Sequence, residues 1–388
     1  MPKLICPYGH TSNIFSPTYI SLTIWECIIY SYNTAGQDSL LSYPSITNPL
    51  VVNNTYNSRG WLQQIAANNN SNNIFSEQLV FTPNGNVSQQ TVNYYNFNPS
   101  TFDTLKMSYE YDIVNRLSAA INTKNTIQNE TYTYDADGNF LTKNRYGKNI
   151  SYTYVPGTNR ISNINLNNLT QNYIFNYKGN LISDGLKGLA NFIYDYRNLP
   201  LSLTKSGQTI VYSYDDKGER ILKKTASVNE YYLRDHTGRE LAIYDLTANR
   251  IKMANIFGNG LIGRVDVNWV QTSGFYWDEN HMKVFYTTTT RSDDRCYYLK
   301  DHLGSNRMTI NSLGVVTNVQ DYYAYGEVLR SYNNSTPNEK YKFTGKERDT
   351  ETDLDYFGVR FYDSELGRWL NFFLKPSFRT TDFSLCDN

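Results

Sequence analysis

Aromatic and polar residues alternate in short stretches along most of the chain. Examples are YEYDIVNRL at 109–117, YTYDADGNFL at 132–141 and YSYDDKGERI at 212–221. Side chains on a β-strand alternate between the two faces, so an aromatic-x-aromatic pair places two rings on one face. Turn-forming residues and then an aliphatic residue follow each pair. The pattern predicts a series of β-hairpins.

These units recur at a nearly constant distance. Six of them can be aligned on their second aromatic residue, with successive separations of 23, 20, 23, 17 and 20 residues. About 20 residues is enough for two strands and two turns. A single hairpin is marginal in water, so we expect the units to pair edge to edge in one long sheet. The aligned residues are Tyr111, Tyr134, Tyr154, Tyr177, Tyr194 and Tyr214.

Turn chemistry follows the aromatic pairs. An aspartate at the first position of a turn accepts hydrogen bonds from backbone N–H groups further along. A glycine shortly afterwards supplies the left-handed conformation that closes such a turn. The predicted turn residues are Asp112, Asp135, Asp195, Asp215, Gly138, Gly179 and Gly218.

Composition supports an all-β protein. Tyrosine accounts for 35 of the 388 residues, and tyrosine favours pleated, half-buried surfaces. We expect very little helix, and only in the first fifty or the last eighteen residues. The formal net charge is zero, which removes the electrostatic argument for nucleic acid or an anionic membrane as an obligate partner.

The N-terminal stretch and the cysteines point to no special chemistry. Residues 14–32 are moderately apolar but too interrupted for a signal peptide or a membrane span, so we expect a buried or disordered start. Export stays open. The cysteines are far apart and form no C-x-x-C pair, which argues against zinc, redox motifs and a disulfide scaffold. They are Cys6, Cys27, Cys296 and Cys386.

The repeats and the segment that follows them resemble the Rhs family. The downstream stretches are YYLKDHLGSNRMTINSLGVVTNVQDYYAYGEVL at 297–329 and YKFTGKERDTETDLDYFGVRFYDSELGRW at 341–369. They are similar to the Rhs repeat-associated core, and the hairpin units are similar to YD repeats, which also occur in teneurins and insecticidal toxin-complex C subunits. The matching core residues are Asp301, His302, Gly304, Gly345, Arg348, Asp349, Tyr356, Gly358, Arg360, Tyr362, Asp363, Gly367 and Arg368.

This resemblance implies that the repeats wind as a spiralling sheet into a hollow shell, with the core segment closing it near its end. In the family a variable C-terminal region, commonly a toxin, follows the core. The implied division is an unassigned segment at 1–55, YD repeats at 56–290, the core at 291–370, and a divergent tail without a toxin domain at 371–388.

Family members that release their cargo carry an aspartyl self-cleavage motif with a D-P-x-G core after this segment. The tail has no such motif, so Asp382 and Asp387 receive no catalytic role. We expect the intact protein to run as a single band near 44.9 kDa and to be tolerated by its host.

Three other groupings invite chemistry. Asp349, Glu351, Asp353 and Asp355 have the i, i+2 spacing that would put four carboxylates on one strand face, where Ca²⁺ could bind, although a charged strand edge is the favoured interpretation. Asp353 stands where the family usually has glycine. The stretch DADGN at 135–139 is interpreted as a plain turn. Cys6 and His10 have a ligand-like spacing but lack a second pair.

Two histidines occur in parallel settings, His236 in YYLRDHTGRE and His302 in YYLKDHLGSN. No nucleophile setting accompanies them, and adjacent strand residues face opposite ways, so Asp301 is not expected to orient His302. We interpret both histidines as turn or polar packing residues.

The sequence therefore predicts a structural shell segment without catalytic activity or cofactor. Expected partners are other segments of a larger shell, a toxin cargo or cell-surface glycans, with no nucleic acid and no membrane span. The alternative is a carbohydrate-binding or cell-surface adhesion module. Aromatics in a few loops would favour the alternative, whereas here they recur inside every strand pair, as wall residues would.

Overall fold

The computed structural model describes residues 3–5, 28–43, 49–70, 72–95, 104–279, 282–334 and 339–370. Regular structure in these residues is β-strand except for two 3-10 turns, η1 (Thr126–Gln128) and η2 (Phe343–Gly345). The predicted all-β fold of successive antiparallel hairpins is confirmed. The tail at 371–388 and the Cys6–His10 pair lie outside the described residues.

Most of the described chain forms one antiparallel sheet of 27 strands, in which each strand pairs with the next along the sequence. The early strands also belong to this sheet, and all but the last two of them precede the first aligned repeat unit at 109–117. They are β1 (Lys3–Ile5), β2 (Ile28–Tyr32), β3 (Asp38–Tyr43), β4 (Leu50–Tyr56), β5 (Leu62–Asn69), β6 (Asn72–Phe81), β7 (Val87–Tyr94), β8 (Leu105–Tyr111) and β9 (Leu117–Asn122).

The central strands follow the predicted repeats. They are β10 (Glu130–Tyr134), β11 (Phe140–Arg145), β12 (Lys148–Tyr154), β13 (Ile161–Leu166), β14 (Leu169–Phe175), β15 (Leu181–Asp184), β16 (Leu189–Tyr194), β17 (Pro200–Lys205), β18 (Gln208–Tyr214), β19 (Arg220–Lys224), β20 (Asn229–Arg234) and β21 (Glu240–Asp245).

The late strands complete the sheet, and four short strands form a second one. The first group is β22 (Arg250–Gly258), β23 (Gly260–Trp277), β24 (Lys283–Lys300), β25 (Asn306–Asn311), β26 (Val316–Tyr322) and β27 (Val328–Asn333). The second group, called here the core sheet, is β28 (Glu347–Asp349), β29 (Leu354–Tyr356), β30 (Phe361–Asp363) and β31 (Arg368–Trp369).

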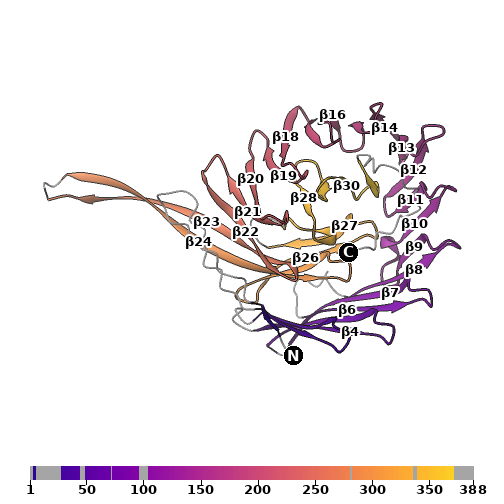
Figure 1. Cartoon of the computed structure of the whole chain (residues 1–388), viewed down its shortest axis with the longest axis horizontal. Helices are drawn as coiled ribbons and strands as arrows, with labels where there is room; N and C mark the ends of the chain where they lie inside the picture. The colour runs from indigo at the N-terminus through magenta and orange to yellow at the C-terminus, as the bar shows by residue number, and fades with distance from the viewer. Residues whose placement is uncertain are drawn as a thin grey trace.

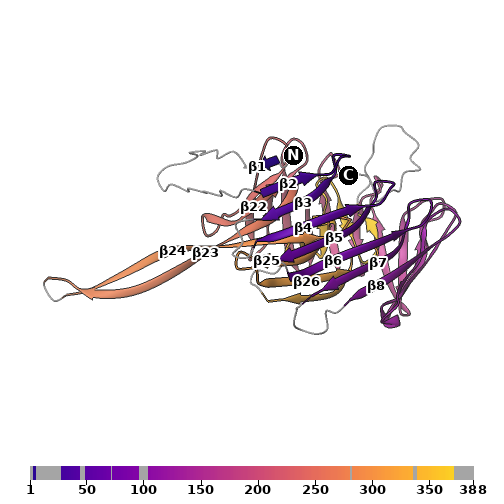
Figure 2. The ribbon, with the colours of Figure 1, turned by 90° about the horizontal axis from the view of Figure 1, so that it is seen from below.

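The large sheet curls back on itself, so that its early strands pack against its late ones (Figures 1 and 2). Tyr43 and Tyr297 meet there edge to face with ring centroids 5.3 Å apart, and the Tyr94 hydroxyl donates to the Asp321 carboxylate. Burial of this apolar layer stabilises the curled shape. The core sheet lies on the inner side of the curve (Figure 1).

Strands β23 and β24 extend far beyond the body of the molecule as a two-stranded arm (Figures 1 and 2). They pair continuously from Gly263–Tyr297 to Trp277–Lys283. The aromatic residues near its tip, such as Trp277 and Phe285, are exposed.

The repeat turns share one geometry. In the Asp135 turn, the carboxylate accepts hydrogen bonds from the N–H groups of Asp137 and Asn139, at 2.9 and 2.8 Å. The backbone N–H of Gly138 donates to the Asp135 carbonyl, and Gly138 has φ +84°. This is a three-residue hairpin loop closed by a left-handed residue. Asn115 takes the left-handed position in the Asp112 turn.

The two aromatic residues of each unit have different roles. The first ring points inward and is buried, as for Tyr132, Tyr152 and Tyr212. The second ring is less buried, and its hydroxyl donates to a backbone carbonyl of the preceding unit, for example from Tyr154 to Phe140 at 2.7 Å. The same bond is made by Tyr111, Tyr134, Tyr194 and Tyr214.

The alignment of Tyr177 with these residues was wrong. Tyr177 lies at the apex of a turn and is 91% exposed. The turn begins at Asn176, whose side chain accepts from the N–H groups of Lys178 and Asn180, so the equivalent strand residue is Phe175. Asparagine here does what aspartate does in the other turns, which the tyrosine–aspartate pattern did not anticipate.

Candidate functional site

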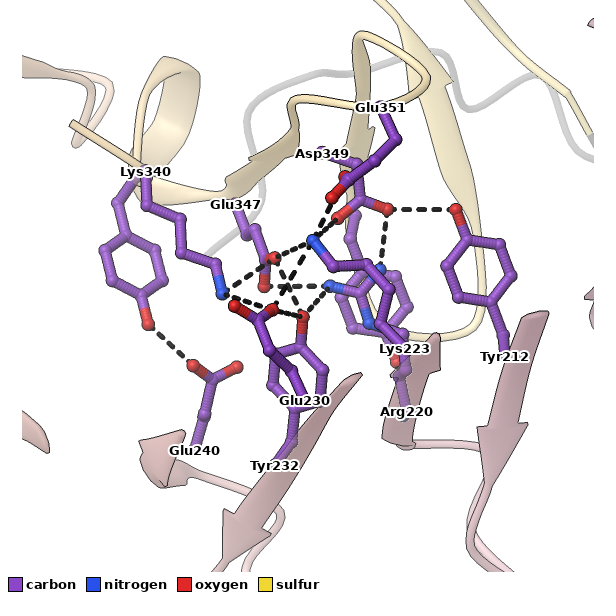
Figure 3. A network of polar contacts seen from close by, with 12 residues as sticks. Tyr212, Arg220, Lys223, Glu230, Tyr232, Glu240, Lys340, Glu347, Asp349 and Glu351 are labelled. Atoms are coloured by element: carbon purple, nitrogen blue, oxygen red, sulfur yellow. Dashed lines mark hydrogen bonds and ion pairs between the residues drawn. The ribbon is translucent and has the colours of Figure 1, made fainter. Parts of the chain in front are cut away.

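The best-defined cluster of functional groups lies where the core sheet meets the inner face of strands β18 to β21 (Figure 3). We call it the polar seam. The large sheet, called here the wall, contributes Tyr212, Arg220, Lys223, Glu230, Tyr232 and Glu240. The C-terminal segment contributes Lys340, Tyr341, Glu347, Asp349, Glu351 and Tyr356.

Arg220 is the centre of the seam. It is fully buried, and its Nη1 lies 2.7 Å from Asp349 Oδ2 while its Nη2 lies 2.8 Å from Glu347 Oε2. The guanidinium also faces the rings of Tyr232 and Tyr356, at 4.7 and 4.3 Å from their centroids. A planar guanidinium can bind two carboxylates through its rigid fork of N–H donors and stack flat on aromatic faces at once, whereas a lysine ammonium acts as a point charge.

A β-bulge explains why two cations of one short strand both face inward. The register between β18 and β19 shifts between Ser213 and Tyr214, opposite the start of β19. The shift brings Arg220 and Lys223, three residues apart, to the same face. Other return strands share this spacing of buried residues, including β11 with Phe140 and Lys143.

Lys223 joins the carboxylates from the other side. Its Nζ lies 3.3 Å from Asp349 Oδ1 and 3.2 Å from Glu351 Oε2. Lys340 adds a contact of 2.9 Å with Glu347 Oε1. Two lysines and one arginine thus surround the acidic strand β28.

Charge compensation decides the protonation of the buried acids. Burial alone would raise the pKa of Glu347, but Arg220, Lys340 and Lys223 outweigh it and hold the pKa well below the usual range. For Glu230, burial is likewise outweighed by Lys340, Lys223 and Lys252, which lower its pKa to about 2. Both groups are therefore ionised at neutral pH.

Further contacts hold the rest of the core sheet against strands β11 to β16. The buried Lys143 donates to the backbone carbonyls of Ser364 and Glu365, at 3.2 and 3.0 Å. Arg368 donates to the Tyr154 hydroxyl at 3.1 Å. Between these polar anchors, core-sheet residues such as Leu354 pack on the buried rings of the wall.

Most of the residues that match the repeat-associated core lie in or next to the contact between the core sheet and the wall. Arg348 forms a bidentate pair with Asp355 at 2.8 and 2.7 Å, and the Tyr362 hydroxyl donates to the Tyr325 carbonyl. Asp363 accepts from the N–H groups of Glu365 and Leu366. The guanidinium of Arg360 stacks on Trp369, and left-handed turns are made by Gly304, Gly345, Gly358 and Gly367.

Asp301 and His302 occupy a separate buried network. As expected, they form a turn, in which Asp301 accepts from the N–H groups of Leu303 and Ser305 and its other oxygen pairs with Arg307 at 2.8 Å. The residue that contacts the His302 ring is Glu77 of β6, at 2.8 Å from Nδ1. His236 sits exposed in the parallel Asp235 turn.

The single strand face of four carboxylates, which the calcium alternative required, is not formed. The four carboxylates do not share a strand face, because a turn with Asp353 at φ +60° separates β28 from β29. Each carboxylate has a cationic neighbour: Asp349 has Arg220, Glu351 has Lys223, Asp353 has Lys187, and Asp355 has Arg348. Within the described residues, no group of three or more His, Cys, Asp or Glu side chains is arranged to hold a metal ion.

Sequence reasoning missed the buried charged residues of the large sheet, both inside and outside the seam. Arg220, Lys223, Lys143 and Glu77 were not singled out, although all four are buried. A detectable signal was present, because charged residues occupy positions where the neighbouring repeats have inward-facing apolar residues. Such a buried charge needs a partner of opposite sign, and the C-terminal segment is rich in acids.

Chemically, the seam is a compensated network of ion pairs that holds two sheets together.

Cys296 is buried, and burial raises the pKa of its thiol to about 12, so the thiol is protonated at neutral pH. Among the described residues, no helix has the length and apolar character to cross a membrane.

Comparison with known proteins agrees with this architecture. The family model of the teneurin YD-shell matches residues 21–381. Salivary gland surface protein 1 of Aedes aegypti is 26% identical over 260 residues, covering 62% of this chain and 7% of that protein. Toxin subunit YenC1 of Yersinia entomophaga is 26% identical over 166 residues, covering 41% of this chain and 16% of that protein. Mouse teneurin-3 is 24% identical over 276 residues, covering 69% and 9% respectively.

Among solved structures, the chain is similar to the Tc holotoxin pore of Photorhabdus luminescens, with a TM-score of 0.48 and 16% identity over 89% of this chain and 20% of that one. The fold itself defines an all-β repeat protein, in which successive hairpins form one curled antiparallel sheet. The chain belongs to the teneurin YD-shell family. It spans between 7 and 26% of the length of the curated relatives that it matches.

Proposed function

We propose that this chain is a wall segment of a larger shell that encloses a C-terminal effector, and that the segment itself is not catalytic. The observation that carries the proposal is the polar seam, which fixes the C-terminal part of the described chain to the inner face of the wall. A shell role is common to the family, and one of its members is named as a toxin subunit.

The direction of the chain supports enclosure. The core sheet ends against the wall, where Leu370 is buried and its carbonyl accepts from the N–H of Leu181. A polypeptide that continues from this point starts on the inner side of the curve. An effector attached there would therefore begin inside the shell.

The aromatic residues also favour a wall. Rings such as Tyr152 and Tyr212 are buried against the core sheet rather than offered to a ligand. The seam pairs its carboxylates with cations, which stabilises a fixed contact and leaves no free base for general acid–base chemistry within it.

Protease accessibility tests the proposal. The same cleavage site is inserted after Leu370 in one variant and after Glu279, at the tip of the arm, in another. We expect the first site to be cut at least roughly tenfold more slowly, because cleavage must wait for local opening of the contact. Equal cleavage rates in two folded variants would show that the chain leaves the wall on the outside, and the enclosure proposal would fail.

A further inference from the structure

The arm formed by β23 and β24 has a long unpaired strand edge. Strand β24 pairs with β25 from Cys296 to Lys300, but from Lys283 to Asp294 its only partner among the described residues is β23. The arm stands clear of the body in both views (Figures 1 and 2). The outer edge of β24 is remote from the polar seam, and no part of the shell role uses it.

The base of the arm shows which backbone groups face this edge. The Arg295 carbonyl accepts a hydrogen bond from the N–H of Ser312, on the side of β25. Backbone groups alternate in direction along a strand, so the odd-numbered residues of β24 direct their N–H and C=O groups toward the outer edge. In the arm these residues include Phe285, Thr289 and Arg291. Such a row of groups is a template for pairing with another strand.

The features that usually block edge pairing are missing from the middle of this edge. Strands β23 and β24 pair without a register shift, so no bulge twists the edge away. Residues 284–290, VFYTTTT, contain no charge, proline or glycine. Phe285 and Tyr286 are 74% and 46% exposed. A two-stranded ribbon is marginal in water, so a further strand would stabilise the arm.

We propose that the outer β24 edges of two copies of this chain pair antiparallel and form a four-stranded sheet. A two-fold axis at Thr288 places Lys283 of one copy opposite Asp293 of the other, and opposite charges across a strand pair attract. The same axis places Phe285 opposite Arg291, where the guanidinium can lie over the ring. The edge is therefore complementary to itself, which favours a second copy as its partner.

The charges also select the register. A two-fold axis keeps every side chain on its own face of the sheet, so the pairing can shift only in steps of two residues. One step places Lys283 opposite Arg291 of the second copy, and the opposite step places it opposite Arg295. Like charges directly opposite are destabilising. Because the arm projects from the body, antiparallel pairing leaves the two bodies at opposite ends of the shared sheet (Figure 2).

Sedimentation equilibrium of the full chain, up to about 100 µM, tests this inference, which goes beyond the proposed shell function. We expect a dimer with a dissociation constant on the order of 10 µM, as for a small interface. Lys283→Glu and Asp293→Lys each place like charges opposite one another twice, and each should weaken the dimer at least roughly tenfold. An equimolar mixture of the two variants should recover the dimer, because the new glutamate of one faces the new lysine of the other.

Two proline variants form a matched pair. Thr289→Pro removes an N–H group that faces the proposed contact, and we expect it to abolish the dimer. Gln271→Pro makes the same change at the cross-strand neighbour, whose N–H group faces the opposite edge of the arm, and the dimer should persist. Equal losses in these two variants, a mixture that does not recover, or a chain that stays monomeric at every concentration, including one that binds phosphatidylcholine vesicles instead, would each overturn the proposal.

Discussion

The guanidinium of Arg220 and the carboxylate of Asp349 lie 2.7 Å apart and fully buried, although 129 positions of sequence separate the two residues. One belongs to the wall and the other to the core sheet. The pair therefore depends on the correct docking of one sheet on the other.

Removing one partner should be costly. Asp349→Ala removes one of the two carboxylates that pair with Arg220 and leaves the Glu347 carboxylate. It also deprives Lys223 of its contact with Asp349. Breaking a buried pair in this way typically costs about 3–5 kcal/mol. We expect a loss of that size in the free energy of unfolding, measured by equilibrium urea denaturation.

Arg239→Ala is the control for this experiment. Arg239 makes an ion pair of the same kind with Asp235, at 2.8 Å, but its side chain is 55% exposed. Exposed pairs contribute about 0–1 kcal/mol, so the unfolding midpoint should hardly move. Similar losses in the two variants would contradict the assignment of the seam as a buried attachment of the core sheet to the wall.

The hairpin turns give a second prediction. Gly138 has φ +84° and open space around its Cα, so only the backbone conformation resists a side chain there. Gly138→Ala should cost about 1–2 kcal/mol in unfolding free energy. Gly138→Asn should cost less, since asparagine holds this conformation at Asn115 and Asn198. An alanine variant as stable as the asparagine variant would refute the conformational argument.

The two aromatic positions of a repeat give a third prediction. Tyr152 is buried against the core sheet, and Tyr152→Ala is expected to cost about 3–5 kcal/mol. Tyr154→Phe removes the hydroxyl that donates to Phe140 and accepts from Arg368, which should cost about 1 kcal/mol. Thermal or urea unfolding distinguishes the two values, and a ranking in the opposite order would reject the inward and lateral roles assigned to these rings.

Stability should depend on pH in two opposite ways. Burial and then Asp363 raise the pKa of Asp184 from 3.8 to about 6. The folded state therefore binds this proton more readily than the unfolded state, and stability should rise as pH falls from about 6 toward 4. The pKa of Glu230 is lowered from 4.5 to about 2, so its contribution should be lost as pH falls through that range.

We expect the urea midpoint of the protein to pass through a maximum near pH 4 to 5. Asp184→Asn keeps the acceptor for the Lys187 N–H while removing the titration, and it should reduce the rise between pH 7 and 5. The remaining rise comes from Asp355, whose pKa burial also raises to about 6. The decline below about pH 4 should persist in this variant. An unchanged rise would show that another group is responsible for it.

Local chemistry made the wall predictable from the sequence. Aromatic pairs with a period of two, followed by turn residues, correspond to hairpins such as β10–β11 and β18–β19. The placement failed at Tyr177, where the tyrosine belongs to the turn and Asn176 replaces the usual aspartate. Periodicity alone could not separate the two alignments, because both leave an aromatic residue near the turn.

Of the two sides of the polar seam, the sequence indicated only the one from the C-terminal segment. The motif containing Arg348, Asp349 and Tyr356 was recognisable as a segment, but its contacts depend on a bulge that turns Arg220 and Lys223 to one face. A bulge adds one residue to one strand and has no sequence signature of its own at this site. The strand-face argument for Asp349, Glu351, Asp353 and Asp355 failed for a related reason, since an unforeseen turn divides them.

The anchors of the core sheet also limit how many repeats the wall can contain. The core sheet contacts Lys143 in β11 at one end and Tyr232 in β20 at the other. An added or missing hairpin between these strands would move one anchor by two strand widths, about 9.6 Å, and the contacts at the two ends could no longer form together. The core sheet therefore fixes the number of strands between its two ends, and repeats can be gained or lost in evolution more easily outside the interval from β11 to β20 than within it.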